Sequence, residues 1–84
     1  TIVNRRGLHA RASAKFVGAV AVLPEGVKVT VSKPPHSAAG GSILGLMMLG
    51  AAKGDTVEVA VEGDGADAVL ADLVALIADG FGED

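Results

Sequence analysis

The sequence predicts a small single-domain α+β fold in which helices cover one face of an antiparallel sheet and leave the other face to solvent. The chain has 84 residues, enough for one modest two-layer core. Two stretches alternate valine with polar residues, as half-buried strands do, and two longer stretches repeat apolar residues at helical spacing. The expected order of elements within the single domain 1–84 is βαββαβα.

The first elements are a strand and a helix. Ile2 to Asn4 is expected to be the visible part of a first strand that is already under way at Thr1, and the sequence does not tell whether residues precede Thr1. A loop, Arg5 to Leu8, leads to a helix that begins at or just after His9 and runs to about Val22. Its apolar face repeats at helical spacing, and Leu23 to Gly26 contains the proline and glycine of a helix stop.

The middle of the chain predicts two strands and a short helix. Residues 27–32 alternate valine with lysine, threonine and serine, the pattern of a half-buried strand. The prolines at 34 and 35 turn the chain, and His36 to Ala39 is expected to form a short strand. Ser42 is a suitable N-cap for a helix from Ile43 to Leu49, which Gly50 ends.

The last elements are a strand and an amphipathic helix. Residues 56–62 again alternate valine with polar or small residues and predict the last strand. Gly63 to Gly65 separates it from a helix over Ala66 to about Asp79, which has a broad apolar face and ends at Gly80.

The segment RGLHARAS, Arg6 to Ser13, places His9 where a loop becomes a helix. Gly7 supplies a flexible hinge, and good helix formers follow His9. The first N–H groups of a helix lack internal partners and, with the helix dipole, attract anions. Arg11 adds a planar fork of donors that matches phosphate oxygens. Histidine as a residue type offers a neutral nitrogen nucleophile near pH 7. His9 is therefore predicted to accept a phosphoryl group that Arg11 and the helix start stabilise.

Two further blocks accompany this segment in a fixed order: GGSILGLMMLGAAKGD (Gly40 to Asp55) and LIADGFGED (Leu76 to Asp84). Together the three blocks, which span nearly the whole chain, resemble the HPr family of histidine-containing phosphocarrier proteins. The resemblance implies an open-faced two-layer sandwich whose four-stranded antiparallel sheet has the order 1-4-2-3, with three helices on one face. Ala12 stands where the family usually has proline, and alanine can adopt the same first-turn conformation.

The resemblance implies that His9 takes a phosphoryl group on Nδ1 from enzyme I, supplied ultimately by phosphoenolpyruvate, and passes it to enzyme IIA-type acceptors. The chain is then a phosphotransfer intermediate rather than an independent enzyme, needs no cofactor, and is expected to be a cytoplasmic monomer. The shared motifs fit both the sugar-uptake branch and the nitrogen-regulatory branch, named NPr. Ala12 and Ser13, in place of the usual proline and alanine, weakly favour the regulatory branch. Arg5, Arg6, Arg11 and Lys15 form a basic cluster that could steer an acidic partner.

The segment that begins at Ser42 is predicted to be a regulatory and docking region. Ser42 matches the serine that a dedicated kinase phosphorylates in some HPr proteins, a role compatible with its N-cap role. The helix after it carries more apolar residues than one side can bury, so part of it is expected to remain exposed. By the family match, Ile43, Leu44 and Met47 are the predicted docking residues, whereas Leu46 and Leu49 are assigned to the core.

Composition excludes several other classes. The net charge of −3 and the two aromatic residues speak against nucleic-acid binding, and the lack of cysteine excludes disulfides and thiol chemistry. No apolar run reaches the ~18 residues of a membrane helix. The two histidines lack nearby carboxylate clusters, so no metal site is expected, and His36 is taken as a loop residue. The alternative is a non-catalytic α+β regulatory or ligand-binding module, in which residues 6–13 only start a helix. Phosphorylation on histidine would exclude it.

Overall fold

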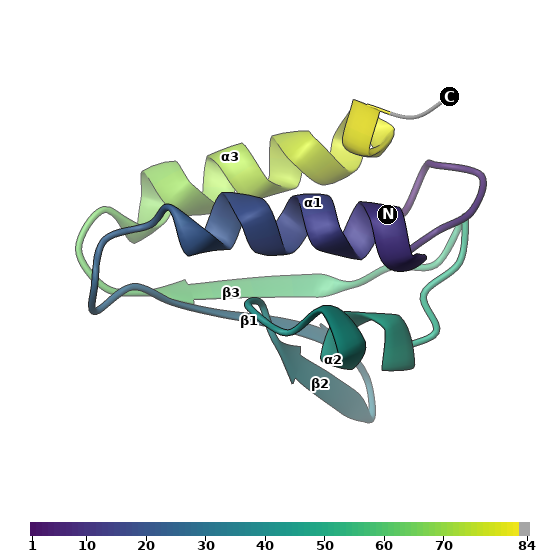
Figure 1. Cartoon of the computed structure of the whole chain (residues 1–84), viewed down its shortest axis with the longest axis horizontal. Coiled ribbons are helices and arrows are strands. Elements are labelled where there is room, and N and C mark those ends of the chain that lie inside the picture. Colours follow the sequence, from purple (N-terminus) through teal and green to yellow (C-terminus); the bar gives the residue numbers. More distant parts are fainter. Residues whose placement is uncertain (83–84) are drawn as a thin grey trace.

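The computed structural model describes residues 1–82 and has the elements α1, β1, β2, α2, β3, α3 and η1 in that order (Figure 1). The helices are α1 (Ala10–Ala21), α2 (Ile43–Met48), α3 (Ala66–Ala78) and a short 3-10 turn, η1 (Gly80–Gly82). The strands are β1 (Lys28–Lys33), β2 (His36–Ala39) and β3 (Glu58–Glu62). Glu83 and Asp84, the end of the third sequence block, lie outside the described residues. The predicted α+β class is confirmed.

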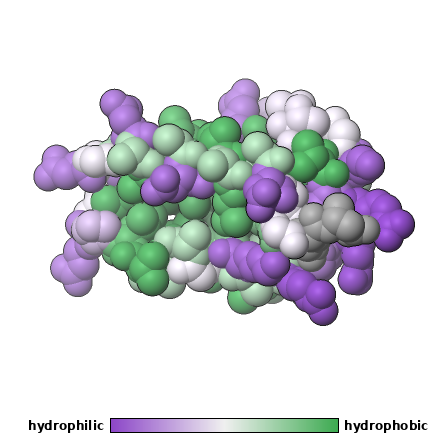
Figure 2. Space-filling view, turned by 90° about the horizontal axis from the view of Figure 1, so that it is seen from above, coloured by the Kyte–Doolittle hydropathy of each residue, from purple (hydrophilic) through white to green (hydrophobic). Residues whose placement is uncertain are grey.

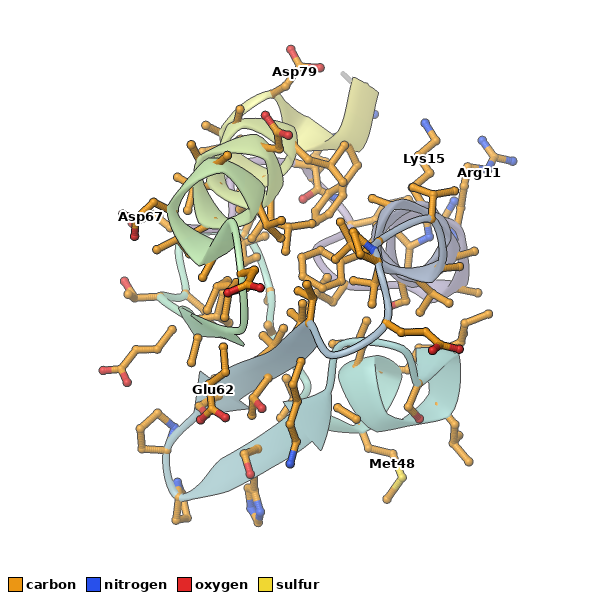
Figure 3. The ribbon with its side chains drawn as sticks, turned by 90° about the vertical axis from the view of Figure 1, so that its left-hand side faces the viewer. Arg11, Lys15, Met48, Glu62, Asp67 and Asp79 are labelled. Carbon is orange, nitrogen blue, oxygen red and sulfur yellow. The ribbon has the colours of Figure 1, made fainter. Side chains whose placement is uncertain are left out.

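The three strands of the described chain form an antiparallel sheet in the order β2-β1-β3. Val31, near the middle of β1, pairs with Ala38 of β2 on one side and Val59 of β3 on the other. Val29 and Val31 are buried, and the helices lie on that face of the sheet (Figures 1 and 3). The alternation of valine therefore predicted correctly that β1 is half-buried and that the helices cover one face of the sheet.

The predicted four-stranded sheet of order 1-4-2-3 is wrong for the described residues, because Ile2 to Asn4 do not form a strand. Ile2 makes two backbone hydrogen bonds: its N–H donates to Asp55 O at 2.8 Å, and its carbonyl accepts from Gly54 N at 2.8 Å. A ladder needs such pairs to repeat along the segment. Here the chain turns at Asn4, so the pairing is limited to one residue.

The core lies between the helices and the sheet. Its buried side chains come from every layer, and the first segment contributes Ile2 although it is not a strand. The largest fully buried apolar members are Phe16, Phe81, Ile2, Leu46 and Val31. Figure 2 looks onto the helix layer and shows hydrophobic surface along it, interrupted by single hydrophilic residues, with hydrophilic residues gathered at both ends. Within residues 1–82, none of the helices has the length and apolar character needed to cross a membrane.

The ends of the long helices follow their sequence signals. His9 is the N-cap of α1, and Gly80, at φ +65°, follows the last turn of α3. Phe81 also adopts a left-handed conformation, with φ +58°, and is only 1% exposed. The chain therefore folds back after α3 and places an aromatic ring in the core beside α1.

Candidate functional site

His9 occupies the N-cap of α1 with extended backbone angles, φ −76° and ψ −178°. Its Nδ1 accepts a hydrogen bond from the backbone N–H of Arg11 at 3.2 Å, and its carbonyl accepts from Ser13 N at 2.9 Å. An accepting Nδ1 carries a lone pair, so the neutral ring that fits this bond has its proton on Nε2. The half-buried side chain thus directs an unprotonated nitrogen at the positive end of a helix.

Arg11 and Lys15 lie one helical turn apart on α1 and point the same way, away from the sheet (Figure 3). Both residues are exposed. Lys15 Nζ donates to the carbonyl oxygen of Phe81 at 2.6 Å, which ties α1 to η1. The Arg11 guanidinium is thus an exposed donor group two residues after His9, while Lys15 adds positive charge and also holds the C-terminal turn.

Gly7 was predicted to be a flexible hinge, but close contacts and hydrogen bonds fix the turn in which it lies. Gly7 has φ +62°, and a Cβ atom added to it would overlap Ala51 O. Its carbonyl accepts from Asn4 Nδ2 at 2.8 Å, and Leu8 N donates to Ala51 O at 3.0 Å. Gly7 is thus a fixed element of the site rather than a flexible hinge.

Asn4 is a site residue that sequence reasoning missed, because it was assigned to the end of a strand. The signal was present in the sequence: asparagine at the first position and glycine at the fourth are typical of a type I turn. Asn4 and Gly7 occupy those two positions, and Gly7 N donates to Asn4 O at 3.2 Å.

Ser42 is the N-cap of α2, as predicted. Its Oγ accepts from Gly45 N at 3.0 Å. Gly45 has little spare room, since a Cβ there would stand 3.0 Å from Ser42 Oγ and 3.2 Å from Ala38 Cβ. The hydroxyl is part-buried and is committed to the helix start.

The exposed apolar residues of α2, named here the α2 patch, are Ile43 (42% exposed), Leu44 (68%), Met47 (40%) and Met48 (76%). Ile43, Leu44 and Met47 are the predicted docking residues. Met48 was not predicted, although it points away from the rest of the molecule (Figure 3). Leu46 and Leu49 are buried, as expected. Because α2 packs on α1 and Ala51 bonds to Leu8, the patch and His9 lie in neighbouring parts of the surface.

The loop of residues 50–55 follows α2 and contacts the turn before His9 through the bond from Leu8 N to Ala51 O. An ion pair anchors this loop. Lys33 Nζ lies 3.2 Å from Asp55 Oδ2 and 3.4 Å from Gly50 O. Ala52 N also donates to Asp55 Oδ2, at 2.9 Å. Hydrogen bonds lower the pKa of the Asp55 carboxyl below its ordinary value of 3.8; the bond from Ala52 N is the largest cause and the bond from Lys33 the next.

The other predicted features lie apart from His9. His36 is the first residue of β2 and is exposed. Over residues 1–82, no three histidine, aspartate or glutamate side chains gather closely enough to hold a metal ion. A hollow of about 300 Å³ between α1 and α3 has mostly apolar walls and does not include His9 or Arg11. The candidate site is a surface site at the start of α1.

Comparison with known proteins gives consistent matches over the chain. The family model described as "PTS HPr component phosphorylation site" matches residues 1–79. The phosphocarrier protein HPr of Pseudomonas aeruginosa is 45% identical over 84 residues, which cover 99% of this chain and 91% of that protein. The phosphocarrier protein NPr of Shewanella violacea is 36% identical over 83 residues, with 99% and 89% covered.

Solved structures agree with these matches. The crystal structure of HPr-C-His from Thermoanaerobacter tengcongensis has a TM-score of 0.89 and 36% identity, and the match covers 99% of this chain and 91% of that one. An HPr dimer from the same organism has a TM-score of 0.79 and 36% identity, with 99% and 93% covered.

Proposed function

Because the chain belongs to the HPr family, the phosphocarriers of the phosphotransferase system, we propose that His9 is the residue that carries the phosphoryl group. The observation that supports this most directly is the N-cap geometry. His9 Nδ1 accepts from Arg11 N at 3.2 Å, so the ring presents a lone pair where backbone donors are gathered.

The transfer needs positioning and charge stabilisation more than a general base. A bond forms between His9 Nδ1 and phosphorus while the bond between phosphorus and the phosphohistidine nitrogen of enzyme I breaks. His9 keeps its proton on Nε2, and the donor imidazole leaves with the electron pair. The ring must first give up the bond from Arg11 N, and a phosphoryl oxygen can then accept from that same N–H.

Arg11 is the proposed side-chain stabiliser of the transferred group. It lies two residues after His9 on an exposed face of α1, and its guanidinium can offer two parallel donors to equatorial oxygens. His9 is half-buried and Arg11 is exposed, so the site is shallow and does not enclose the phosphoryl group. A shallow site suits a carrier, because a closed site would oppose onward transfer to an enzyme IIA-type acceptor.

The α2 patch is the proposed docking surface, with Ile43, Leu44 and Met47 as its predicted contacts and Met48 at its edge. Methionine side chains adapt to surfaces of different shape, which suits a carrier that must meet a donor and an acceptor in turn.

Ser42 is a candidate for phosphorylation by a serine kinase. Phosphorylation would convert the Oγ that accepts from Gly45 N into a phosphate-ester oxygen and would add negative charge beside the docking surface. We further propose that the protein works as a monomer in the cytoplasm, where phosphoenolpyruvate is available. Its relatives include both HPr and NPr, so the proposal covers transfer in the sugar-uptake branch and in the nitrogen-regulatory branch.

The test is incubation with enzyme I and phosphoenolpyruvate, followed by intact-mass measurement before and after mild acid. The expected result is one acid-labile phosphate that His9→Ala abolishes. His36→Ala is the matched control, since it removes the other histidine, which is exposed at the start of β2, and should leave labelling unchanged. Arg11→Ala should be labelled more slowly.

Labelling of His9→Ala at the normal rate would refute the assignment. A protein that stays unlabelled should be tested again with the donor of the nitrogen branch. Absence of label with both donors would favour the binding-module alternative.

A further inference from the structure

The geometry points to Asn4 as the residue that positions His9 for phosphoryl transfer. This inference rests on the proposed role of His9 and adds a second residue to it. Asn4 does not touch the reacting atoms; we infer that it acts through the peptide group between Gly7 and Leu8, immediately before His9.

Asn4 is a polar side chain at a site of core burial. It is only 1% exposed, among the least exposed of residues 1–82. Its Cα and Cβ also lie within 3.7 Å of the position where a Cβ of Gly80 would stand, so it packs against the turn that follows α3. Burial of a carboxamide is unfavourable unless its polar atoms are bonded, and an apolar side chain of similar size would avoid that cost. The polar group therefore has a use other than filling space.

Asn4 closes the turn of residues 4–7 with two hydrogen bonds, one through its backbone carbonyl and one through its side-chain amide. Gly7 N donates to Asn4 O at 3.2 Å, and Asn4 Nδ2 donates to Gly7 O at 2.8 Å. Both backbone polar groups of Gly7 are thus bonded to the same residue. The second bond has the length of a good N–H···O bond and lies in a buried setting, where competition from water is weak.

The peptide group between Gly7 and Leu8 is consequently fixed at its two ends. Its carbonyl accepts from Asn4 Nδ2, and its N–H donates to Ala51 O at 3.0 Å. A peptide plane has little freedom once both its groups are bonded in opposite directions. Leu8 is the only residue between this plane and His9, so rotation of the plane would move the His9 ring relative to Arg11 N.

Small displacements at this point matter for transfer. A group that must approach phosphorus in line loses rate steeply when it is misplaced by about 1 Å. His9 Nδ1 now lies 3.2 Å from Arg11 N, at the helix start where the phosphoryl group must be received, and a shift of the ring would move Nδ1 away from that position. Loss of the Asn4 donor should therefore slow transfer more than it weakens docking, because the α2 patch lies outside the turn.

The test compares Asn4→Leu, which keeps the branching of the side chain with larger apolar groups and removes the donor, with Asn4→Asp, which keeps the size and shape and replaces the donor by a carboxylate oxygen. Leu73→Val is the control, since Leu73 is a core residue of α3 that is 2% exposed and does not belong to the turn. Three quantities are measured: amide hydrogen exchange at Leu8, the ¹⁵N chemical shift of His9 Nδ1, and the rate and KM of phosphorylation by enzyme I.

We expect both Asn4 variants to exchange the Leu8 amide at least about tenfold faster relative to the amides of β1, and to shift the His9 Nδ1 signal. The transfer rate should fall about tenfold while KM for enzyme I changes less than twofold. Leu73→Val should change none of the three quantities when the variants are compared under conditions that give them equal thermal stability.

An Asn4→Leu protein with normal Leu8 exchange and a transfer rate equal to that of the control would overturn the inference. If neither Asn4 variant folds, the unmodified protein still decides the matter: an Asn4 side-chain amide that exchanges as fast as a free amide would show that the bond to Gly7 is absent. Failure of the proposed function looks different, because the unmodified protein would then carry no phosphate on His9 while the exchange measurements remained interpretable.

Discussion

Replacing Gly7 with alanine tests whether the turn before His9 is fixed by close packing. Gly7 has φ +62°, a region that residues with a Cβ enter at a cost. The added Cβ would overlap Ala51 O and would stand 2.8 Å from Ala52 Cα. Both neighbours are backbone atoms, so the contact can be relieved only if the turn and the loop of residues 50–55 move apart.

The expected loss of stability is the sum of a conformational and a contact contribution. The left-handed conformation costs alanine about 1–2 kcal/mol. Separation of the turn from the loop breaks the bond between Leu8 N and Ala51 O and strains that of Asn4, each worth about 1 kcal/mol. Gly7→Ala should therefore lower the free energy of unfolding by about 3–4 kcal/mol.

Gly50→Ala is the matched control. Gly50 has nearly the same φ, +66°, but a Cβ added there would meet open space, with nothing beyond its chain neighbours within 4 Å. It should therefore show the conformational contribution alone, about 1–2 kcal/mol. Urea denaturation of the three proteins measures the difference. Equal losses for Gly7→Ala and Gly50→Ala would show that the contact with Ala51 does not constrain the turn.

Three further predictions concern α2 and the loop after it. Ser42→Ala should lower the free energy of unfolding by about 1 kcal/mol, since Gly45 N loses its acceptor; an unchanged urea midpoint would contradict the cap. The lowered pKa of Asp55 means that its contribution to stability is present above the ordinary value of 3.8 and is lost as pH falls through the lower folded-state pKa. The thermal stabilities of wild type and Asp55→Asn should thus converge in acid, and a constant gap would refute the role of the Lys33 pair. Leu44→Asp should raise KM for enzyme I about tenfold in a normally folded protein, whereas Leu46→Ala, in the core, should cost about 2–5 kcal/mol of stability; the reverse pattern would mean that the exposed and buried sides of α2 were misassigned.

Most of the fold was predictable because its signals are local. The alternation of valines predicted β1 and β3, and Ser42 predicted the start of α2 through its side-chain oxygen. The strand predicted over Ile2 to Asn4 was wrong, because its absence depends on more than the local pattern. Two β-branched residues beside Asn4 resemble a strand end, but Asn4 begins a turn whose bonds stop the pairing after Ile2.

The residues of the candidate site also differ in whether local sequence reveals them. His9 and Arg11 were found from sequence because the helix start and the spacing of two residues are local features. The fixed state of Gly7 depends on Ala51, which is 44 positions further along the chain, and no pattern around Gly7 reveals that neighbour. Lys15 was assigned to a basic cluster, yet its bond to Phe81 O requires the chain to return past α1 after α3. Contacts of this kind follow from topology rather than from local sequence.

The α2 patch also determines where oxidation would act on this molecule. The chain has two methionines and no cysteine, so both of its sulfur atoms lie in Met47 and Met48, on the exposed side of α2. Oxidation to the sulfoxide turns a flexible apolar side chain into a polar one. Neither methionine belongs to the buried core, so an oxidant would alter the surface proposed for docking while the turn, His9 and the core keep their structure. Because the sulfoxide can be reduced enzymatically, the change would be reversible.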